Sequence, residues 1–151
     1  MLFADPLVER QEVEDVVVRV FVATDRRDWA GVESCLADAV TLDMTSMTGG
    51  EPLRLTPAEV SAGWRDGLAP IDFVHHQIGN FRIAVDGDSA TASCYGIAFH
   101  HRDRISTPSK TRTFVGSYDF HLTRTTAGWR IDLFRFNLKF IDGNRELEKA
   151  T

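Results

Sequence analysis

The sequence has few cysteines and no long apolar run. Two cysteines, Cys35 and Cys94, are too few for a disulfide framework, and their apolar surroundings predict buried thiols in a reducing compartment. Residues 1–11 lack the basic start and apolar stretch of a secretory signal peptide. The longest apolar runs, such as residues 16–18, fall far short of the roughly 20 residues that span a bilayer. We therefore expect a cytoplasmic protein that has no membrane partner.

Basic residues are also too few, and too scattered, for a nucleic-acid surface. The chain has 17 basic and 22 acidic residues and a net charge of -5, whereas phosphate binding needs a clustered basic face. Its hydrophobic content of 43% and charged content of 26% are ordinary for a soluble globular protein. A length of 151 residues predicts one domain over residues 1–151. Ten phenylalanines are enough to build a large apolar interior or pocket.

The first half of the chain is predominantly helical in pattern. Apolar residues recur between residues 13 and 24 at the spacing of one face of an amphipathic helix. Asp28 is a good N-cap for a second short helix. Residues 56–59, Thr-Pro-Ala-Glu, form a capping box with proline at the first helical position, and they predict a third helix. Alternation over residues 40–44 predicts a short strand, and the glycines and proline of residues 49–52 predict a loop.

The second half has the pattern of a strand meander. Extended segments are predicted over residues 73–85, 90–101, 111–123 and 129–141. The polar stretch 102–110 between the second and third of these segments is expected to be a loop and a candidate lid. Helices followed by long antiparallel strands predict an α+β fold, in which a curved sheet carries helices on one face. Such a sheet leaves a concave place of the kind that ligands occupy.

Asp25 is the most informative polar residue in the first helix. It lies four positions after Phe21, so it extends the apolar stripe of that helix instead of its solvent face. A carboxylate that points inward there is placed as a general base, or as the partner that orients one. The alternative, which spacing alone favours, is that the helix ends one residue earlier and Asp25 caps the turn into Asp28.

Four of the five histidines stand in adjacent pairs, at residues 75–76 and 100–101. Neighbours on a strand point to opposite faces, so one member of each pair can face the interior. His76 alternates with apolar residues, and His101 shares its face with Phe99 and two other large apolar residues. The sequence therefore predicts that His76 and His101 point inward. Taken singly, each is better explained as a core or interface histidine that is hydrogen-bonded to the backbone.

Two inward histidines together with an inward Asp25 are harder to explain by packing, and two chemistries could use them. A facial triad of two histidines and one carboxylate can hold non-haem iron. Alternatively, the carboxylate orients one imidazole, which then moves a proton. No cysteine pair and no His-x-His spacing supports a metal. We therefore expect neither a metal nor a cofactor.

Three short motifs resemble the SnoaL-like proteins of the NTF2-like superfamily, and most closely scytalone dehydratase. Residues 24–29 resemble the D-x-x-D-W that ends the first helix, and residues 76–80 resemble the H-x-I-G-G/N strand. Residues 128–131 match the G-W-x-I that begins the last strand. The resemblance covers residues 8–138. It implies a cone-shaped, curved antiparallel sheet, with three helices from the N-terminal half packed on its concave face.

The resemblance also implies roles for the site. Asp25 orients His76, His76 removes a proton from carbon as the general base of an elimination, and His101 contributes to binding or proton transfer. The residues expected to line the substrate pocket are Thr24, Met44, Phe99, Tyr118 and Arg135.

Departures from the family pattern limit what can be carried over. Thr24 and Met44 stand where scytalone dehydratase has the tyrosines that hold the leaving-group water, so we do not expect that activity itself. Tyr118 could replace a lost hydroxyl, or it could be a packed strand tyrosine. Arg135 could act as the additional arginine of related dehydratases, or it could face solvent, which is the simpler interpretation.

Two functions follow from these observations. The first is a cofactor-independent, dehydratase-like lyase or an isomerase that acts on a small, largely apolar substrate. The second is a non-catalytic small-molecule-binding or accessory module, since this fold also serves such roles and does not itself decide function. The Asp25–His76 pair favours the enzyme. Residues 133–141 are apolar on both faces, which predicts a homo-oligomer, either a trimer or a dimer.

Overall fold

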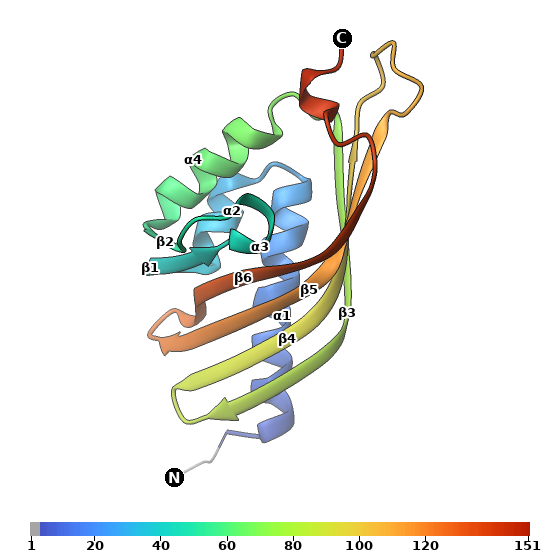
Figure 1. The fold of residues 1–151 in the computed structure, drawn as a ribbon. Helices are drawn as coiled ribbons and strands as arrows, with labels where there is room; N and C mark the ends of the chain where they lie inside the picture. Colours follow the sequence, from blue (N-terminus) through green and yellow to red (C-terminus); the bar gives the residue numbers. More distant parts are fainter. Residues whose placement is uncertain (1–3) are drawn as a thin grey trace.

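The computed structural model describes residues 4–151, with helices in the first half of the chain and long strands in the second (Figure 1). The elements in chain order are α1 (Pro6–Asp25), α2 (Trp29–Ser34), β1 (Leu36–Asp43), α3 (Thr45–Thr48), β2 (Leu53–Leu55), α4 (Pro57–Leu68), β3 (Phe73–Asp86), β4 (Ser89–His101), β5 (Thr111–Thr125), β6 (Gly128–Gly143) and the 3₁₀ turn η1 (Leu147–Lys149). The three predicted helices and five predicted strands are confirmed. The short elements α3 and β2 were not predicted.

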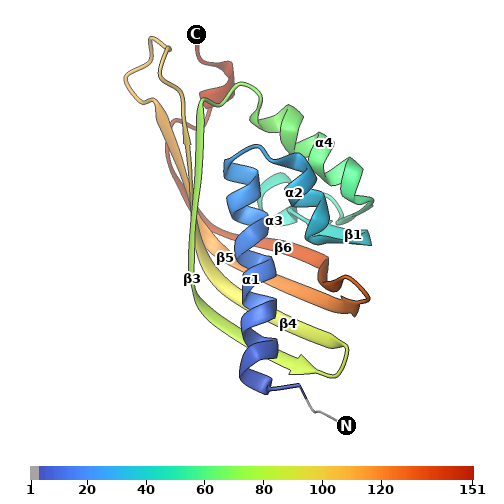
Figure 2. The ribbon, with the colours of Figure 1, turned by 180° about the vertical axis from the view of Figure 1, so that it is seen from behind.

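The six strands form one open sheet in the order β2-β1-β6-β5-β4-β3. All neighbours are antiparallel except β1 and β6, which run parallel. The long strands β3 to β6 bend strongly, and Figure 2 shows α1 lying across their concave face, with α2 and α4 beside the short β1 end. The expected curved sheet with helices on its concave face is thus confirmed, with one parallel pair added.

Local signals in the sequence explain where the helices begin. The Asp5 side chain accepts a hydrogen bond from the Leu7 N–H, with proline at the first helical position of α1. At α4, the Thr56 hydroxyl accepts from the Glu59 N–H, and the Glu59 carboxylate accepts from the Thr56 N–H. The buried face of α1 carries the predicted apolar stripe. Asp25 is the last residue of this helix, and Arg27 follows it with a left-handed φ of 56°.

The concave face of β4 carries the small residues of the strand. Ala92, Cys94 and Ala98 are buried, whereas the alternate residues Tyr95 and Phe99 are 54% and 36% exposed on the outer face. Small residues are needed inside because aromatic rings of α1, β5 and β6 fill the concavity. These rings, whose centroids lie 4.8–6.2 Å apart, belong to Phe21, Tyr118, Phe120, Phe134 and Phe136. The prediction that Phe99 lines the pocket is therefore wrong.

A β-bulge in β6 decides which way Arg135 points. The register between β5 and β6 shifts so that Asp132 is an extra residue in β6. Trp129 and Ile131 before the bulge and Phe134 after it are all buried. Arg135 therefore leaves the face that it would share with Trp129 in a regular strand, and it lies on the outer side of the sheet.

Both cysteines are buried and free, as expected. Burial raises the pKa of the Cys35 thiol, and it raises the pKa of Cys94 to about 12. Across residues 4–151, the helices are too short or too polar to traverse a lipid bilayer.

Candidate active site

Asp25 and His76 meet on the concave face of the sheet, where the end of α1 crosses β3. His76 Nδ1 lies 2.6 Å from Asp25 Oδ1, and the His76 backbone N–H donates to Asp25 Oδ2 at 2.8 Å. Both carboxylate oxygens are thus engaged by one residue, which fixes the plane and direction of the imidazole. The cap of α2 is made by Asp28, which accepts from the Gly31 N–H, so Asp25 is not the capping residue of that turn.

The hydrogen bond to Asp25 also selects the tautomer of His76. A carboxylate only accepts, so Nδ1 is the protonated ring nitrogen of the neutral imidazole. The lone pair is therefore on Nε2, the nitrogen that Asp25 does not engage. The side chains of Asp25 and His76 are 18% and 13% exposed, so solvent competes little with this contact.

His76 lines a cavity of about 400 Å³ between the concave face and helices α1, α3 and α4. This volume lies within the range of ligand pockets. Its apolar walls include Phe21, Met44, Trp64, Phe114, Phe134 and Ile141. Its polar side chains are Thr24, Thr48, His76, His100, Arg112, Tyr118 and Glu148. Thr24, Met44 and Tyr118 were predicted to line the pocket, and all three line this cavity.

A second polar group in this cavity was not predicted, and we call its three residues the Arg112 cluster: His100, Arg112 and Glu148. His100 and Arg112 stand directly opposite each other on β4 and β5, and Glu148 comes from η1. Arg112 Nη1 donates to Glu148 Oε2 at 2.7 Å, and Nη2 donates both to Glu148 Oε1 and to His100 Nδ1, the latter at 3.0 Å. The guanidinium also lies 4.9 Å from the centre of the Phe114 ring.

Burial and charge shift the pKa values of three titratable side chains that line the cavity. Burial, and then the Arg112 charge, lower the pKa of His100 to about 4, so its imidazole stays neutral and accepts from Arg112. The hydrogen bond from Arg112 lowers the pKa of Glu148. Burial raises the pKa of Tyr118 well above its ordinary value, so that phenol keeps its proton. The cavity thus combines apolar walls, one oriented imidazole and one neutralised cation.

Comparison with known proteins agrees with this architecture. The sequence model of the SnoaL-like domain matches residues 5–135. The chain belongs to the SnoaL-like family. No significant match was found among curated proteins.

Several solved structures share the fold of this SnoaL-like chain. The Kfla4162 protein from Kribbella flavida is 23% identical, with a TM-score of 0.91 over 97% of this chain and 100% of that one. A candidate scytalone dehydratase from Novosphingobium aromaticivorans DSM 12444 is 12% identical, with a TM-score of 0.76 over 92% and 89% of the two chains. The hexachlorocyclohexane dehydrochlorinase LinA-type3 from Novosphingobium barchaimii LL02 is 11% identical, with a TM-score of 0.74 over 92% of each chain. The expected NTF2-like fold is confirmed.

In this SnoaL-like structure the second inward histidine is His100, and the predicted inward orientation of His101 is wrong. His101 lies on the outer face, where its Nδ1 is 2.6 Å from the Thr111 hydroxyl and its Nε2 is 2.9 Å from Asp103 Oδ1. The prediction took the large apolar residues of β4 as the core face. The small ones face the core, and His100 shares their side of the strand with Ala98. Arg135 also lies outside the cavity, where its Nε donates to Asp43 Oδ2 at 3.0 Å.

The outward position of His101 also separates the three residues that the sequence suggested as a possible facial triad for iron. Asp25 and His76 meet, but His101 lies on the opposite side of the sheet. Within residues 4–151, no three His, Cys, Asp or Glu side chains converge as metal ligands.

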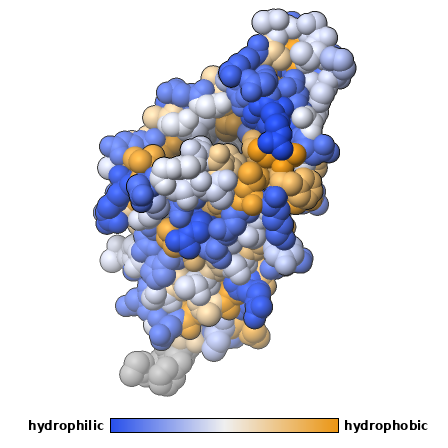
Figure 3. Space-filling view, viewed as in Figure 1, coloured by the Kyte–Doolittle hydropathy of each residue, from blue (hydrophilic) through white to orange (hydrophobic). Residues whose placement is uncertain are grey.

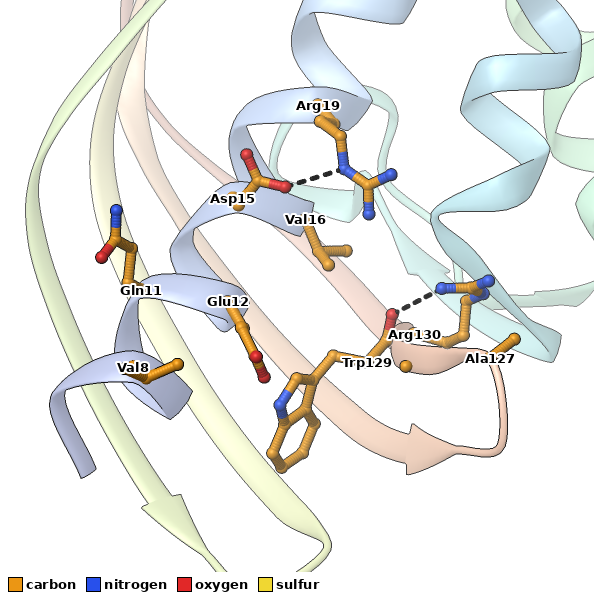
Figure 4. Close-up of a pocket in the computed structure, with 10 residues that line it drawn as sticks. Val8, Gln11, Glu12, Asp15, Val16, Arg19, Ala127, Trp129 and Arg130 are labelled. Atoms are coloured by element: carbon orange, nitrogen blue, oxygen red, sulfur yellow. Dashed lines mark hydrogen bonds and ion pairs between the residues drawn. The ribbon is translucent and has the colours of Figure 1, made fainter. Parts of the chain in front are cut away.

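The SnoaL-like chain has a second hollow of about 450 Å³ between α1 and the β5–β6 turn (Figure 4). Both arginines that line it are engaged locally: Arg19 pairs with Asp15 at 3.1 Å, and Arg130 Nη1 donates to the Trp129 carbonyl at 3.0 Å. The residues that line it do not include the Asp25–His76 pair. The candidate active site is therefore the cavity that holds His76.

Proposed function

We propose that this SnoaL-like protein is a cofactor-independent lyase or isomerase that removes a proton from carbon in a small, largely apolar substrate. The observation that carries the proposal is the 2.6 Å contact between Asp25 and His76 at the wall of a mostly apolar cavity. A base that is held by a carboxylate and faces a ligand-sized cavity is the arrangement that general-base catalysis needs.

In the proposed reaction, His76 Nε2 accepts the proton from a carbon next to a carbonyl or similar activating group. The imidazolium that forms is stabilised by the Asp25 carboxylate at Nδ1. In an elimination, the electron pair of the broken C–H bond forms a double bond and the leaving group departs. In an isomerisation, His76 returns the proton to a different carbon of the same molecule.

The solved relatives support the lyase class. The names of two of them, a dehydrochlorinase and a candidate dehydratase, denote eliminations of hydrogen chloride and of water. Both share the fold of this chain at low identity, so they support a class of chemistry and leave the substrate open. The apolar walls of the cavity favour a substrate that is largely hydrocarbon.

Deuterium uptake tests the proposal without knowledge of the natural substrate. A panel of cyclic and aryl ketones is incubated in D₂O with the protein, and NMR follows exchange of the hydrogens next to the carbonyl. We expect the wild-type protein to accelerate exchange in at least one ketone and His76→Gln to abolish this acceleration. Exchange that is equal in both proteins would contradict the proposal and favour the binding or accessory module.

A further inference from the structure

Arg112 places a buried positive charge in the wall of a cavity that is otherwise mostly apolar. Its side chain is only 9% exposed, and burying an unpaired guanidinium is strongly unfavourable. The charge is therefore kept at this position only because a counter-ion accompanies it. Glu148 is that counter-ion in the structure.

The contact between Arg112 and Glu148 shows which ligand group fits the guanidinium. Both terminal nitrogens of Arg112 donate to the two carboxylate oxygens of Glu148, which is the bidentate geometry that arginine offers to carboxylates. Arg112 Nε is also buried and finds no acceptor among residues 4–151, so the guanidinium keeps a donor beyond those that Glu148 uses. The site is thus built for a planar, anionic group with two oxygens.

Glu148 can leave this site more easily than Arg112 can. The Glu148 side chain is 37% exposed, four times the exposed fraction of its partner. The backbone around it is held independently, because Leu147 is fully buried and Arg102 Nη1 donates to the carbonyls of Leu147 and Ala150 at 2.9 and 2.7 Å. A side-chain rotation toward solvent would therefore free Arg112 without unfolding this segment.

The surface view is consistent with an exit at this position. Figure 3 shows hydrophilic side chains of the segment after β6 directly beside an apolar patch over the C-terminal half of β6. The cavity is lined by Glu148 from this segment and by Ile141 from that end of β6. The Glu148 carboxylate therefore lies where the apolar cavity meets a charged surface.

We infer that Arg112 is the subsite for a carboxylate carried by the otherwise apolar substrate, and that Glu148 occupies this subsite when no ligand is bound. The inference rests on the proposed function, because it assigns the polar end of the substrate at the same site. His76 pairs across the sheet with Ala98, whereas Arg112 pairs with His100, two residues further along β4. His76 and Arg112 share one face of the sheet and lie on β3 and β5, the strands on either side of β4. Two residues along a strand and two strand spacings place their backbones about 12 Å apart, so a small molecule held by the long side chain of Arg112 can present a carbon to His76.

Calorimetric binding of 2-naphthoate and of its neutral analogue 2-naphthamide tests the inference. In Glu148→Gln the internal competitor loses its charge, so naphthoate should bind at least about tenfold more tightly than it binds the wild type, since a hydrogen bond to a charged group is worth that much. Naphthamide affinity should change by less than about twofold, because a neutral amide carries no charge that competes with Glu148 for the guanidinium. Arg112→Met should abolish the preference for naphthoate, and Arg112→Lys should restore part of it.

Glu146→Gln is the matched control, because Glu146 is an exposed glutamate of the same segment and pairs with Lys149. It should leave both affinities unchanged. Thermal unfolding of each variant shows whether it is folded at the binding temperature. Equal gains for naphthoate and naphthamide in Glu148→Gln, or no naphthoate binding to any folded variant, would overturn the inference. Charge-selective binding without deuterium exchange would support the carboxylate subsite and contradict the proposed function. Deuterium exchange without charge-selective binding would support the proposed function and overturn the subsite.

Discussion

Asp25 contributes two separate effects to His76. Its Oδ1 fixes the ring tautomer, and in the proposed reaction its negative charge stabilises the imidazolium that forms on proton transfer. Its Oδ2 accepts the His76 backbone N–H, so the carboxylate is itself held in place. Asparagine has a similar shape but no charge, and its amide can rotate to present a donor to Nδ1. The Asp25→Asn substitution therefore separates the chemistry of this residue from its packing.

We expect Asp25→Asn to lower the rate of proton abstraction by between about 10-fold and 10⁴-fold, the upper value being that of a wrong tautomer in a comparable triad. The rate of deuterium exchange into an active ketone is the measurement. Asp28→Asn is the matched control, because asparagine caps a helix as well as aspartate does and α2 keeps its N-cap. An Asp25→Asn protein as active as Asp28→Asn would rule out the orienting role.

The pKa of His100 gives a prediction for stability. The ordinary pKa of histidine is 6.5, whereas burial and Arg112 lower that of His100 to about 4 in the folded protein. As pH falls from 6.5 to 4, the unfolded chain binds a proton that the folded chain refuses. The free energy of unfolding should therefore decrease over this window, by at most about 3.5 kcal/mol from this residue.

Urea unfolding at intervals between pH 4 and pH 7 measures this dependence. In His100→Gln the amide oxygen can still accept from Arg112, but the side chain no longer titrates, so the decrease should be smaller. His101→Gln, on the outer face of the same strand, should retain the wild-type dependence. Identical pH profiles for His100→Gln and the wild type would show that His100 titrates normally in the folded protein.

At the scale of elements, the helices and strands were predictable because their signals are local. The capping box at Thr56 and the apolar stripe of α1 both specify structure within a few residues. The elements α3 and β2 are short and depend on distant partners. Strand β2 pairs with β1, and Ser46 in α3 donates to the carbonyl of Phe136, which lies 90 residues away. Local pattern alone does not reveal such contacts.

The faces of the strands were harder to predict than the strands themselves. Alternation shows that two faces differ, but it does not show which one faces the helices. The inner face of β4 carries small side chains because Tyr118 and its aromatic neighbours fill the space above it. His100, which lies on this face, therefore lines the cavity in place of His101. On β6 the extra residue Asp132 reverses the alternation before Arg135. Both errors arise from packing between strands, which becomes visible only in three dimensions.

Two glycines allow the aromatic rings of Tyr118 and Phe136 to lie close to the sheet backbone. Gly96 and Gly116 are partners across β4 and β5. A Cβ at Gly116 would overlap the Asn137 carbonyl and the Phe136 ring, whereas a Cβ at Gly79 in β3 would meet nothing within 4 Å. Steric demand therefore differs sharply between glycines of the same sheet.

We expect Gly116→Ala to lower the free energy of unfolding by about 1–3 kcal/mol through overpacking. Gly79→Ala should leave it unchanged or raise it by up to about 1 kcal/mol, because alanine restricts the unfolded chain. Urea unfolding of both variants compares them directly. Equal stabilities would show that the sheet opens at Gly116 without cost.

At the scale of the molecule, the site is assembled from distant parts of the chain. Asp25 and His76 are 51 residues apart, and Arg112 and Glu148 are 36 residues apart. The first pair was predictable because family motifs surround both residues. The second was not, since no local pattern around residue 148 indicates a buried partner. The site therefore depends on complete folding of the curved sheet.

The outer face of the sheet supports the proposal that the protein forms a homo-oligomer. Tyr95, Ile97 and Phe99 form an exposed row along β4, with exposed fractions of 36–54%. Light scattering after size exclusion should give the mass of a dimer or trimer, and Ile97→Lys should shift it toward the monomer. Thr91→Lys, at an exposed position of the same strand, should not. A wild-type monomer at all concentrations would contradict the proposal.

The ring opening of 5-nitrobenzisoxazole measures directly whether His76 acts as a general base in the apolar cavity. A base that removes the C–H proton of this compound breaks its N–O bond and releases a coloured cyanophenolate. His76→Gln should lower the rate by about 10²–10⁴-fold, the usual contribution of a positioned base. His75→Gln, on the exposed face of β3, should match the wild type. A His76→Gln protein that is as fast as the wild type would show that His76 is not the base.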